Sequence, residues 1–237
     1  MTFFILDGYS MAIEPCGAIE KIQLSLISWG EHNFRDFPWR NTRDPYKIMI
    51  AEFMLHRTRA DQVVPVYTQF LQKYPNVYSL AEADPSDIRE VTEHLGLHWR
   101  SGHFIGAAKY VVEHYQGIFP DNESRLQAIP GVGEYVSGVI LTVCYKIPHR
   151  VVDANIARFI NRFFGLHLTG EIRRKKEIRD LADTLFDVDE PGKLLFAILD
   201  FSAAICRSRN PLHLECPLRA KCKYYREKQL SAADVGD

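Results

Sequence analysis

The fold is decided by the stretch Ile129-Pro130-Gly131-Val132-Gly133-Glu134-Tyr135, which the apolar run 136–145 follows directly. Two glycines flank one apolar residue between two expected helices, and this arrangement predicts a tight hairpin. Gly131 and Gly133 permit backbone conformations that other residues avoid, and they let a partner approach the main chain closely. The free amides at the start of the following helix suit a phosphate group. Because many such turns only connect helices, the hairpin alone predicts structure rather than function.

Apolar residues recur with helical spacing along nearly the whole chain. The clearest stripe follows the pattern i, i+3, i+4, i+7 and i+8, which places its members on one helix face. Its members are Phe104, Ala107, Ala108, Val111, Val112 and Tyr115. Short breaks such as Asp84-Pro85-Ser86 separate the stripes, and no alternating pattern typical of a β-hairpin stands out. We therefore expect an all-α fold of roughly ten short helices.

Composition and charge limit what the chain can bind. Its 237 residues are 46% hydrophobic and 25% charged, and the formal net charge is −1. This balance gives no support to nucleic-acid binding by the whole surface, so DNA contacts would have to come from local basic clusters. No apolar run approaches the roughly 20 residues of a membrane span, and the first residues lack a secretory signal. We expect a cytoplasmic protein with no membrane partner.

A carboxylate and an amide precede another striped helix in the segment Val151-Val152-Asp153-Ala154-Asn155. An aspartate at this place is a common helix N-cap. A carboxylate between helices can also stabilise the positive charge that develops on a sugar as its glycosidic bond breaks. The residues alone leave both interpretations of Asp153 open.

Three of the five cysteines are close together near the C-terminus. These are Cys206, Cys216 and Cys222, whereas Cys16 and Cys144 lie far from them in sequence. An odd number of cysteines without a secretory signal argues against a disulfide framework. The C-terminal group therefore predicts a metal site.

The order of these segments resembles the DNA glycosylases of the endonuclease III, MutY and Mig group. The hairpin is followed by V-D-x-N-x-x-R and then by the cysteine group. Segments before the hairpin match as well: Phe37-Pro38-Trp39-Arg40, Asp44-Pro45-Tyr46 and 50–58. The resemblance extends to Cys222 and so covers most of the chain.

The resemblance implies two helical domains that flank a DNA-binding groove. The first is a six-helix domain over residues 43–147, which contains the hairpin. The second is a cluster-containing domain formed by residues 1–42 and 148–237. The target base would be flipped out of the duplex into the groove, because its glycosidic bond is inaccessible inside the base stack. The expected partner is double-stranded DNA with a mismatched or damaged base, and the family implies that a monomer acts on it.

The resemblance also assigns catalytic roles to four residues. Asp153 matches the essential carboxylate, and Asn155 matches the amide that MutY-like enzymes place beside it. Glu52 matches the MutY general acid; in an apolar-rich helix its pKa could be raised, and a partly buried structural carboxylate is the alternative. Tyr135 occupies the position of the lysine that forms a Schiff base in bifunctional relatives. A phenol cannot form that imine, so we predict a monofunctional glycosylase that uses water.

Four residues are expected to contact DNA. Gly131 and Gly133 belong to the hairpin. Arg57 matches the residue that wedges into the base stack in relatives, and Leu97 matches the second intercalating loop. An exposed arginine and a leucine at the end of a helix would also need no special explanation.

The leading substrate is thymine or uracil mispaired with guanine. The arginine-rich segment 55–59, the context of Tyr135 and the segment 152–155 look closer to Mig than to MutY. MutY proper also carries a second C-terminal domain, whereas this chain ends shortly after Cys222.

Three other functions stay open. Two of them share the fold: a MutY-like adenine glycosylase and a glycosylase for oxidised or deaminated bases. The third is a non-catalytic DNA-binding iron–sulfur protein. The joint presence of Asp153, Asn155 and Glu52 argues against this third function.

The family binds its 4Fe–4S cluster with four cysteines spaced C-x6-C-x2-C-x5-C. Here the pattern reads Cys206-x6-His213-x2-Cys216-x5-Cys222, with a histidine in the second position. Iron–sulfur clusters normally take four thiolates, although histidine serves as a ligand elsewhere, and Cys3His is also a zinc set. We predict a 4Fe–4S cluster, with zinc as the alternative. Basic residues in and after this loop suit contact with the DNA backbone, or form a solvated basic surface.

Overall fold

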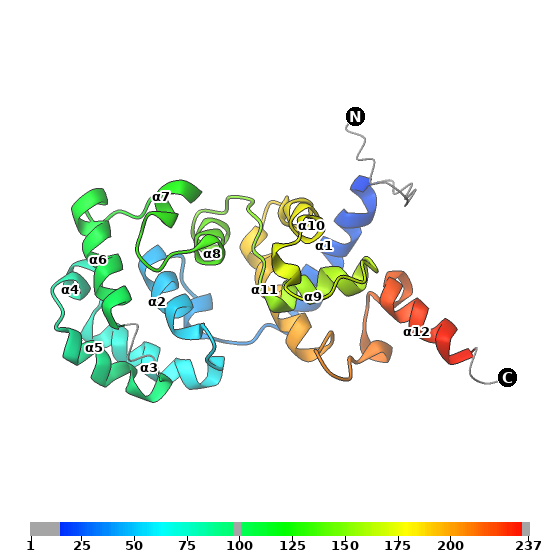
Figure 1. Cartoon of the computed structure of the whole chain (residues 1–237), viewed down its shortest axis with the longest axis horizontal. Helices are drawn as coiled ribbons and strands as arrows, with labels where there is room; N and C mark the ends of the chain where they lie inside the picture. The colour runs from blue at the N-terminus through cyan, green and yellow to red at the C-terminus, as the bar shows by residue number, and fades with distance from the viewer. Residues whose placement is uncertain (1–14, 97–100, 234–237) are drawn as a thin grey trace.

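The computed structural model describes residues 15–96 and 101–233, and every regular element within them is helical (Figure 1). The expected all-α class is confirmed. The α-helices are α1 (Pro15–Glu31), α2 (Pro45–Leu55), α3 (Ala60–Lys73), α4 (Val77–Ala81), α5 (Pro85–Thr92), α6 (Ser101–Tyr115), α7 (Glu123–Gln127), α8 (Glu134–Cys144), α9 (Ala154–Phe163), α10 (Lys176–Phe186), α11 (Pro191–Ala204) and α12 (Lys223–Ala233). Short 3-10 helices are η1 (Pro38–Arg40), η2 (Glu93–Leu95), η4 (Ile172–Arg174), η5 (His213–Glu215) and η6 (Arg219–Lys221).

Several helices begin at a side chain that caps them. Asp44 accepts a hydrogen bond from the Tyr46 amide at 2.9 Å, and Asp84 accepts one from the Ser86 amide at 2.7 Å. Each bond satisfies an amide that has no partner within its own helix. Asp84 lies in one of the short breaks that separate the predicted helices, and the structure places the N-cap of α5 there.

The helices form two groups that lie side by side. Helices α2 to α8 make up one group, and α1 lies with α9 to α12 in the other (Figure 1). Helix α11 packs against both α1 and α8 and so joins the groups. Gly192 makes this close approach possible, because a Cβ atom there would lie 3.0 Å from the Thr142 carbonyl oxygen. The domain boundaries at residues 42/43 and 147/148 stay a prediction.

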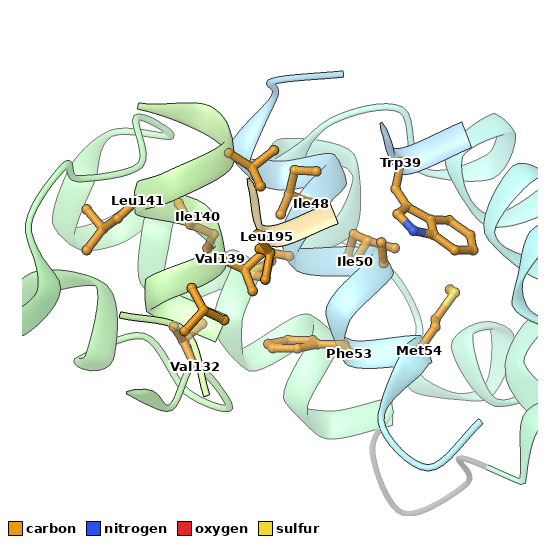
Figure 2. Packing of buried hydrophobic residues seen from close by; sticks show 14 of the residues in the cluster. Trp39, Ile48, Ile50, Phe53, Met54, Val132, Val139, Ile140, Leu141 and Leu195 are labelled. Atoms are coloured by element: carbon orange, nitrogen blue, oxygen red, sulfur yellow. The ribbon is translucent and has the colours of Figure 1, made fainter. Parts of the chain in front are cut away.

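The core follows the predicted stripes. Phe104, Ala107, Ala108 and Val111 are fully buried. Buried side chains of α2 and α8 face one another, and Leu195 from α11 reaches the same cluster (Figure 2). None of the helices in the described ranges is both long and apolar enough to cross a membrane.

A buried ion-pair cluster fixes the segment between α1 and α2. Asp200 on α11 is 2% exposed and accepts hydrogen bonds from Arg40 at 2.9 Å and from Arg35 at 2.5 Å. Burial opposes the charge on Asp200, but the hydrogen bonds from Arg40 and Arg35 outweigh it and lower the pKa of this carboxyl group. Removing one partner of such a buried pair typically costs about 3–5 kcal/mol. The cluster therefore holds η1, and with it the start of α2, against α11.

Candidate functional site

The hairpin between α7 and α8 has the expected tight shape. Gly131 has a φ of +83°, which only glycine adopts readily. A Cβ atom there would also lie 3.1 Å from the Phe53 ring. Val132, at 4% exposure, anchors the turn in the core.

Gly133 has a different role from the one that its backbone freedom suggests. Its φ of −95° is open to any residue, and no side chain caps the start of α8 there. A Cβ atom would meet nothing within 4 Å. The space in front of the α8 amides is therefore open to an approaching group, and the conformational reason predicted for Gly133 is wrong.

Asp153 is the N-cap of α9. Its Oδ1 atom accepts hydrogen bonds from the amides of Asn155 at 2.8 Å and Ile156 at 2.7 Å. Its Oδ2 atom accepts a third from Asn155 Nδ2 at 2.8 Å. The half-buried carboxylate is thus held in one orientation, and the capping interpretation is confirmed. This geometry does not exclude a second role, because a fixed carboxylate is what charge stabilisation requires.

Arg158 fixes the Asn155 amide from the other side. Its Nη1 atom donates to Asn155 Oδ1 at 3.1 Å, while its Nε atom donates to the Cys206 carbonyl at 3.1 Å. The Asn155 amide must therefore turn its Nδ2 group toward Asp153. Sequence reasoning gave Arg158 no role, although its i+3 spacing from Asn155 on a helix places the two side chains on one face.

Glu52 and Tyr135 lie within electrostatic range of Asp153. Burial, and then the charge on Asp153, raise the pKa of Glu52 to about 8, while Arg40 opposes the shift. Burial is also the main cause that raises the pKa of Tyr135, followed by the charges on Glu52 and Asp153. Helix α2 and the starts of α8 and α9 therefore bring these groups together. At neutral pH Glu52 is mainly protonated and can donate a hydrogen bond.

The raised pKa of Glu52 predicts a pH-dependent stability. A carboxyl group whose pKa is higher in the folded state binds more protons when folded, so stability falls as the pH rises from about 4.5 through about 8. At pH 9 we expect the free energy of unfolding of Glu52→Gln, measured by urea denaturation, to exceed that of wild type by about 1–3 kcal/mol. The gap should shrink toward pH 5. Exposed Glu82→Gln is the control, and equal effects of the two variants at pH 9 would contradict the assignment.

The C-terminal donor residues share one cavity. Cys206, His213, Cys216 and Cys222 line it together with apolar side chains of α9. The three cysteines are half-buried, and none forms a disulfide. Burial raises the pKa of Cys216 to about 11, and it also raises that of Cys222. Within residues 15–96 and 101–233, no three His, Cys, Asp or Glu side chains converge on a single-ion position.

Arg162 connects α9 to this loop. Its Nη1 atom lies 3.7 Å from Cys206 Sγ and donates to the Arg207 carbonyl at 2.6 Å. Its guanidinium also lies 5.0 Å from the centre of the Tyr224 ring. The sequence gave no signal for this contact, because a helical arginine usually faces solvent.

Of the two residues expected to intercalate, the structure describes Arg57 but not Leu97. Arg57 lies in the exposed turn after α2 with a φ of +67°, a conformation that non-glycine residues rarely adopt. Leu97 lies outside the residues that the structure describes. The role of Arg57 at the base stack stays a prediction.

Comparison with known proteins places this geometry in context. Residues 50–186 match the model of the HhH-GPD superfamily base excision DNA repair protein. The chain is 36% identical to a thymine-DNA glycosylase of Aeropyrum pernix, over 88% of this chain and 96% of that protein. It is 33% identical to a thymine/uracil-DNA glycosylase of Methanothermobacter thermautotrophicus, over 85% and 91% of the two chains. It is 31% identical to an adenine DNA glycosylase of Mus musculus but covers 42% of that protein.

The chain is also similar in structure to solved DNA repair proteins. A thermostable thymine-DNA glycosylase superposes with a TM-score of 0.81 at 31% identity, over 88% of this chain and 97% of the other. An endonuclease III–DNA complex superposes with a TM-score of 0.72 at 16% identity, over 90% and 98% of the two chains. The second likeness concerns the fold alone.

Proposed function

The chain belongs to the HhH-GPD superfamily of base excision DNA repair proteins, and we propose that it removes thymine or uracil mispaired with guanine. It is a DNA glycosylase, an enzyme that hydrolyses the N-glycosyl bond between base and sugar. The observation that carries the substrate is the degree of sequence identity. The relatives named for thymine or uracil are 32–36% identical to this chain, whereas the adenine DNA glycosylases are 27–31% identical.

The proposed mechanism uses the residues around Asp153. The Asp153 carboxylate stabilises the positive charge that grows on the sugar as the N-glycosyl bond breaks. Water then forms a bond to C1′, and the departing pyrimidine takes the electron pair and a proton. Protonated Glu52 donates a hydrogen bond to a carbonyl oxygen of the flipped base, a role consistent with its raised pKa. Asn155, held by Arg158, keeps Asp153 oriented.

A substrate panel tests this function directly. Duplexes with one G·T, G·U, A·8-oxoguanine, hypoxanthine or hydroxylated pyrimidine site are incubated with excess enzyme and then cleaved with alkali. We expect release of thymine and uracil opposite guanine, and little release of either base opposite adenine. Faster release of adenine opposite 8-oxoguanine would favour the MutY-like alternative. Duplex binding without release of any base would favour a non-catalytic protein.

Tyr135 supports a monofunctional reaction. Its phenol, whose pKa lies well above the ordinary value, has no amine with which to form an imine. We expect no DNA adduct when wild type is treated with borohydride during the reaction. Tyr135→Lys should place an amine near C1′ and produce a trapped adduct together with strand nicking. Trapping of wild type as readily as of the lysine variant would show that another amine acts and would contradict the monofunctional assignment.

We further propose that Cys206, His213, Cys216 and Cys222 hold a 4Fe–4S cluster. The donor set fits in its chemistry: three half-buried thiols and an imidazole line one apolar cavity, and a guanidinium lies beside one of the sulfurs. When bound, the cluster would cross-link the loop between α11 and α12 and would take no part in bond cleavage. We also propose that the enzyme works as a monomer on chromosomal DNA in the cytoplasm.

A further inference from the structure

A run of basic residues precedes and begins α10. Arg173-Arg174-Lys175-Lys176 covers the end of η4 and the first residue of α10, and all four side chains are exposed. Arg173 pairs with Glu171 at 2.6 Å, and Lys176 pairs with Asp180 at 2.5 Å. Arg174 and Lys175 form no ion pair with any residue in the described parts of the chain. Arg174 acts on Glu171 through its charge alone, without an ion pair, so Arg174 and Lys175 are the two cations available to an external partner.

This charge distribution opposes the stability of α10. The start of a helix carries a partial positive charge, so cations there are unfavourable. Lys175 is the N-cap residue and makes no capping hydrogen bond with its side chain. Natural sequences break such local rules mainly where function requires it. The run therefore has a use other than stabilising its helix.

The contacts of this segment place it beside the catalytic candidates. Helix η4 packs against α9, whose N-cap is Asp153. Hydrogen bonding to Glu171 raises the pKa of Arg173, and the charge on Asp153 adds to the shift. Arg173 therefore lies within electrostatic range of the Asp153 carboxylate.

A second set of contacts ties α10 to the hairpin. Arg179, in the first turn of α10, lies 2.8 Å from Glu134, the residue after Gly133. Arg150 links Glu134 at 3.0 Å to Asp183 of α10 at 3.1 Å. Ion pairs through Glu134 thus link the start of α8 to α10.

We propose that residues 173–176 bind backbone phosphates of the DNA strand next to the flipped nucleotide, with Arg174 and Lys175 as the two contacts. The proposal rests on the proposed function, because it takes duplex DNA as the partner. The net charge of the chain is −1, so phosphate binding must come from local groups of this kind. The ion pairs of Arg173 with Glu171 and of Lys176 with Asp180 fix the conformation of the segment on either side of the two contacts.

The test removes the two unpaired charges together. Arg174→Gln/Lys175→Gln is compared with Lys21→Gln/Arg89→Gln, which takes two exposed charges from α1 and α5. Binding to a G·T duplex with a non-cleavable 2′-fluorothymidine, and to a matched G·C duplex, is measured by anisotropy from 50 to 300 mM KCl. We expect the slope of log Kd against log salt concentration to be smaller for the Arg174/Lys175 variant than for wild type, by about 1–2. The affinity of this variant for both duplexes should be about tenfold lower.

The outcomes separate this proposal from the proposed function. A salt slope equal to that of the control variant would overturn the phosphate contact. Slower excision at saturating enzyme with an unchanged salt slope would also overturn it, because the residues would then act in the base pocket. If wild type releases no thymine, the proposed substrate is wrong, yet the binding comparison on the two duplexes still decides whether the segment contacts DNA.

Discussion

Asp153→Asn is expected to slow single-turnover release of thymine by about a thousandfold or more while leaving duplex affinity nearly unchanged. An amide keeps the size of the side chain but loses the charge that stabilises the developing cation on the sugar. The fold should survive, because asparagine caps helices about as well as aspartate. Release is measured with excess enzyme and alkaline cleavage, and affinity by anisotropy.

Asp84→Asn is the matched control for this experiment. Asp84 also caps a helix through the second amide after it, at 2.7 Å, but it precedes α5 and is far from Asp153 in the chain. The same chemical change there should leave excision at the wild-type rate. If Asp153→Asn behaved like Asp84→Asn, Asp153 would be a helix cap and nothing more.

His213→Ala is expected to lose most of the iron that wild type holds, whereas His213→Cys should retain it. Wild type purified without oxygen should carry about four irons per chain and absorb broadly near 400 nm, as 4Fe–4S clusters do. Alanine removes one of the four donors, and cysteine restores the thiolate set that such clusters normally use. Iron, sulfide and zinc are measured on each purified protein.

His32→Ala removes an exposed histidine in the turn after α1 and controls for loss of an imidazole as such. It should leave the iron content unchanged. Wild type that is colourless, folded and active with one zinc would contradict the cluster and identify a Cys3His zinc site. Full retention of iron by His213→Ala would show that the histidine is no ligand.

The helices could be predicted because their signals are local. Apolar spacing marks a buried face, as for Phe104 and Val111, and Asp84 marks a start, so each helix depends on a few neighbouring residues. The apolar surroundings of Glu52 similarly indicated a raised pKa, and its burial bears this out. Asp153 was harder, because capping and charge stabilisation need the same residue at the same place.

The contacts that the sequence did not reveal join residues far apart in the chain. Asp200 meets Arg40 across 160 positions, and Arg158 meets the Cys206 carbonyl across 48. No periodicity links such partners, so a polar residue in a helix looks solvent-facing until the packing is known. Gly133 is the opposite case. Its residue type suggested an unusual backbone conformation, but the structure shows an ordinary one with open space where a side chain would lie.

The pairing of α1 with α11 has a consequence for synthesis on the ribosome. Helix α1 leaves the ribosome well before its packing partner α11, which spans Pro191–Ala204. Helices α2 to α8 are contiguous in sequence, so they can acquire their core while the rest is still being made. During that interval the apolar face of α1, with Ile22 and Leu26, has no native cover. Nascent chains arrested before residue 191 should therefore bind hydrophobic-segment chaperones through α1, and release them once α11 is out.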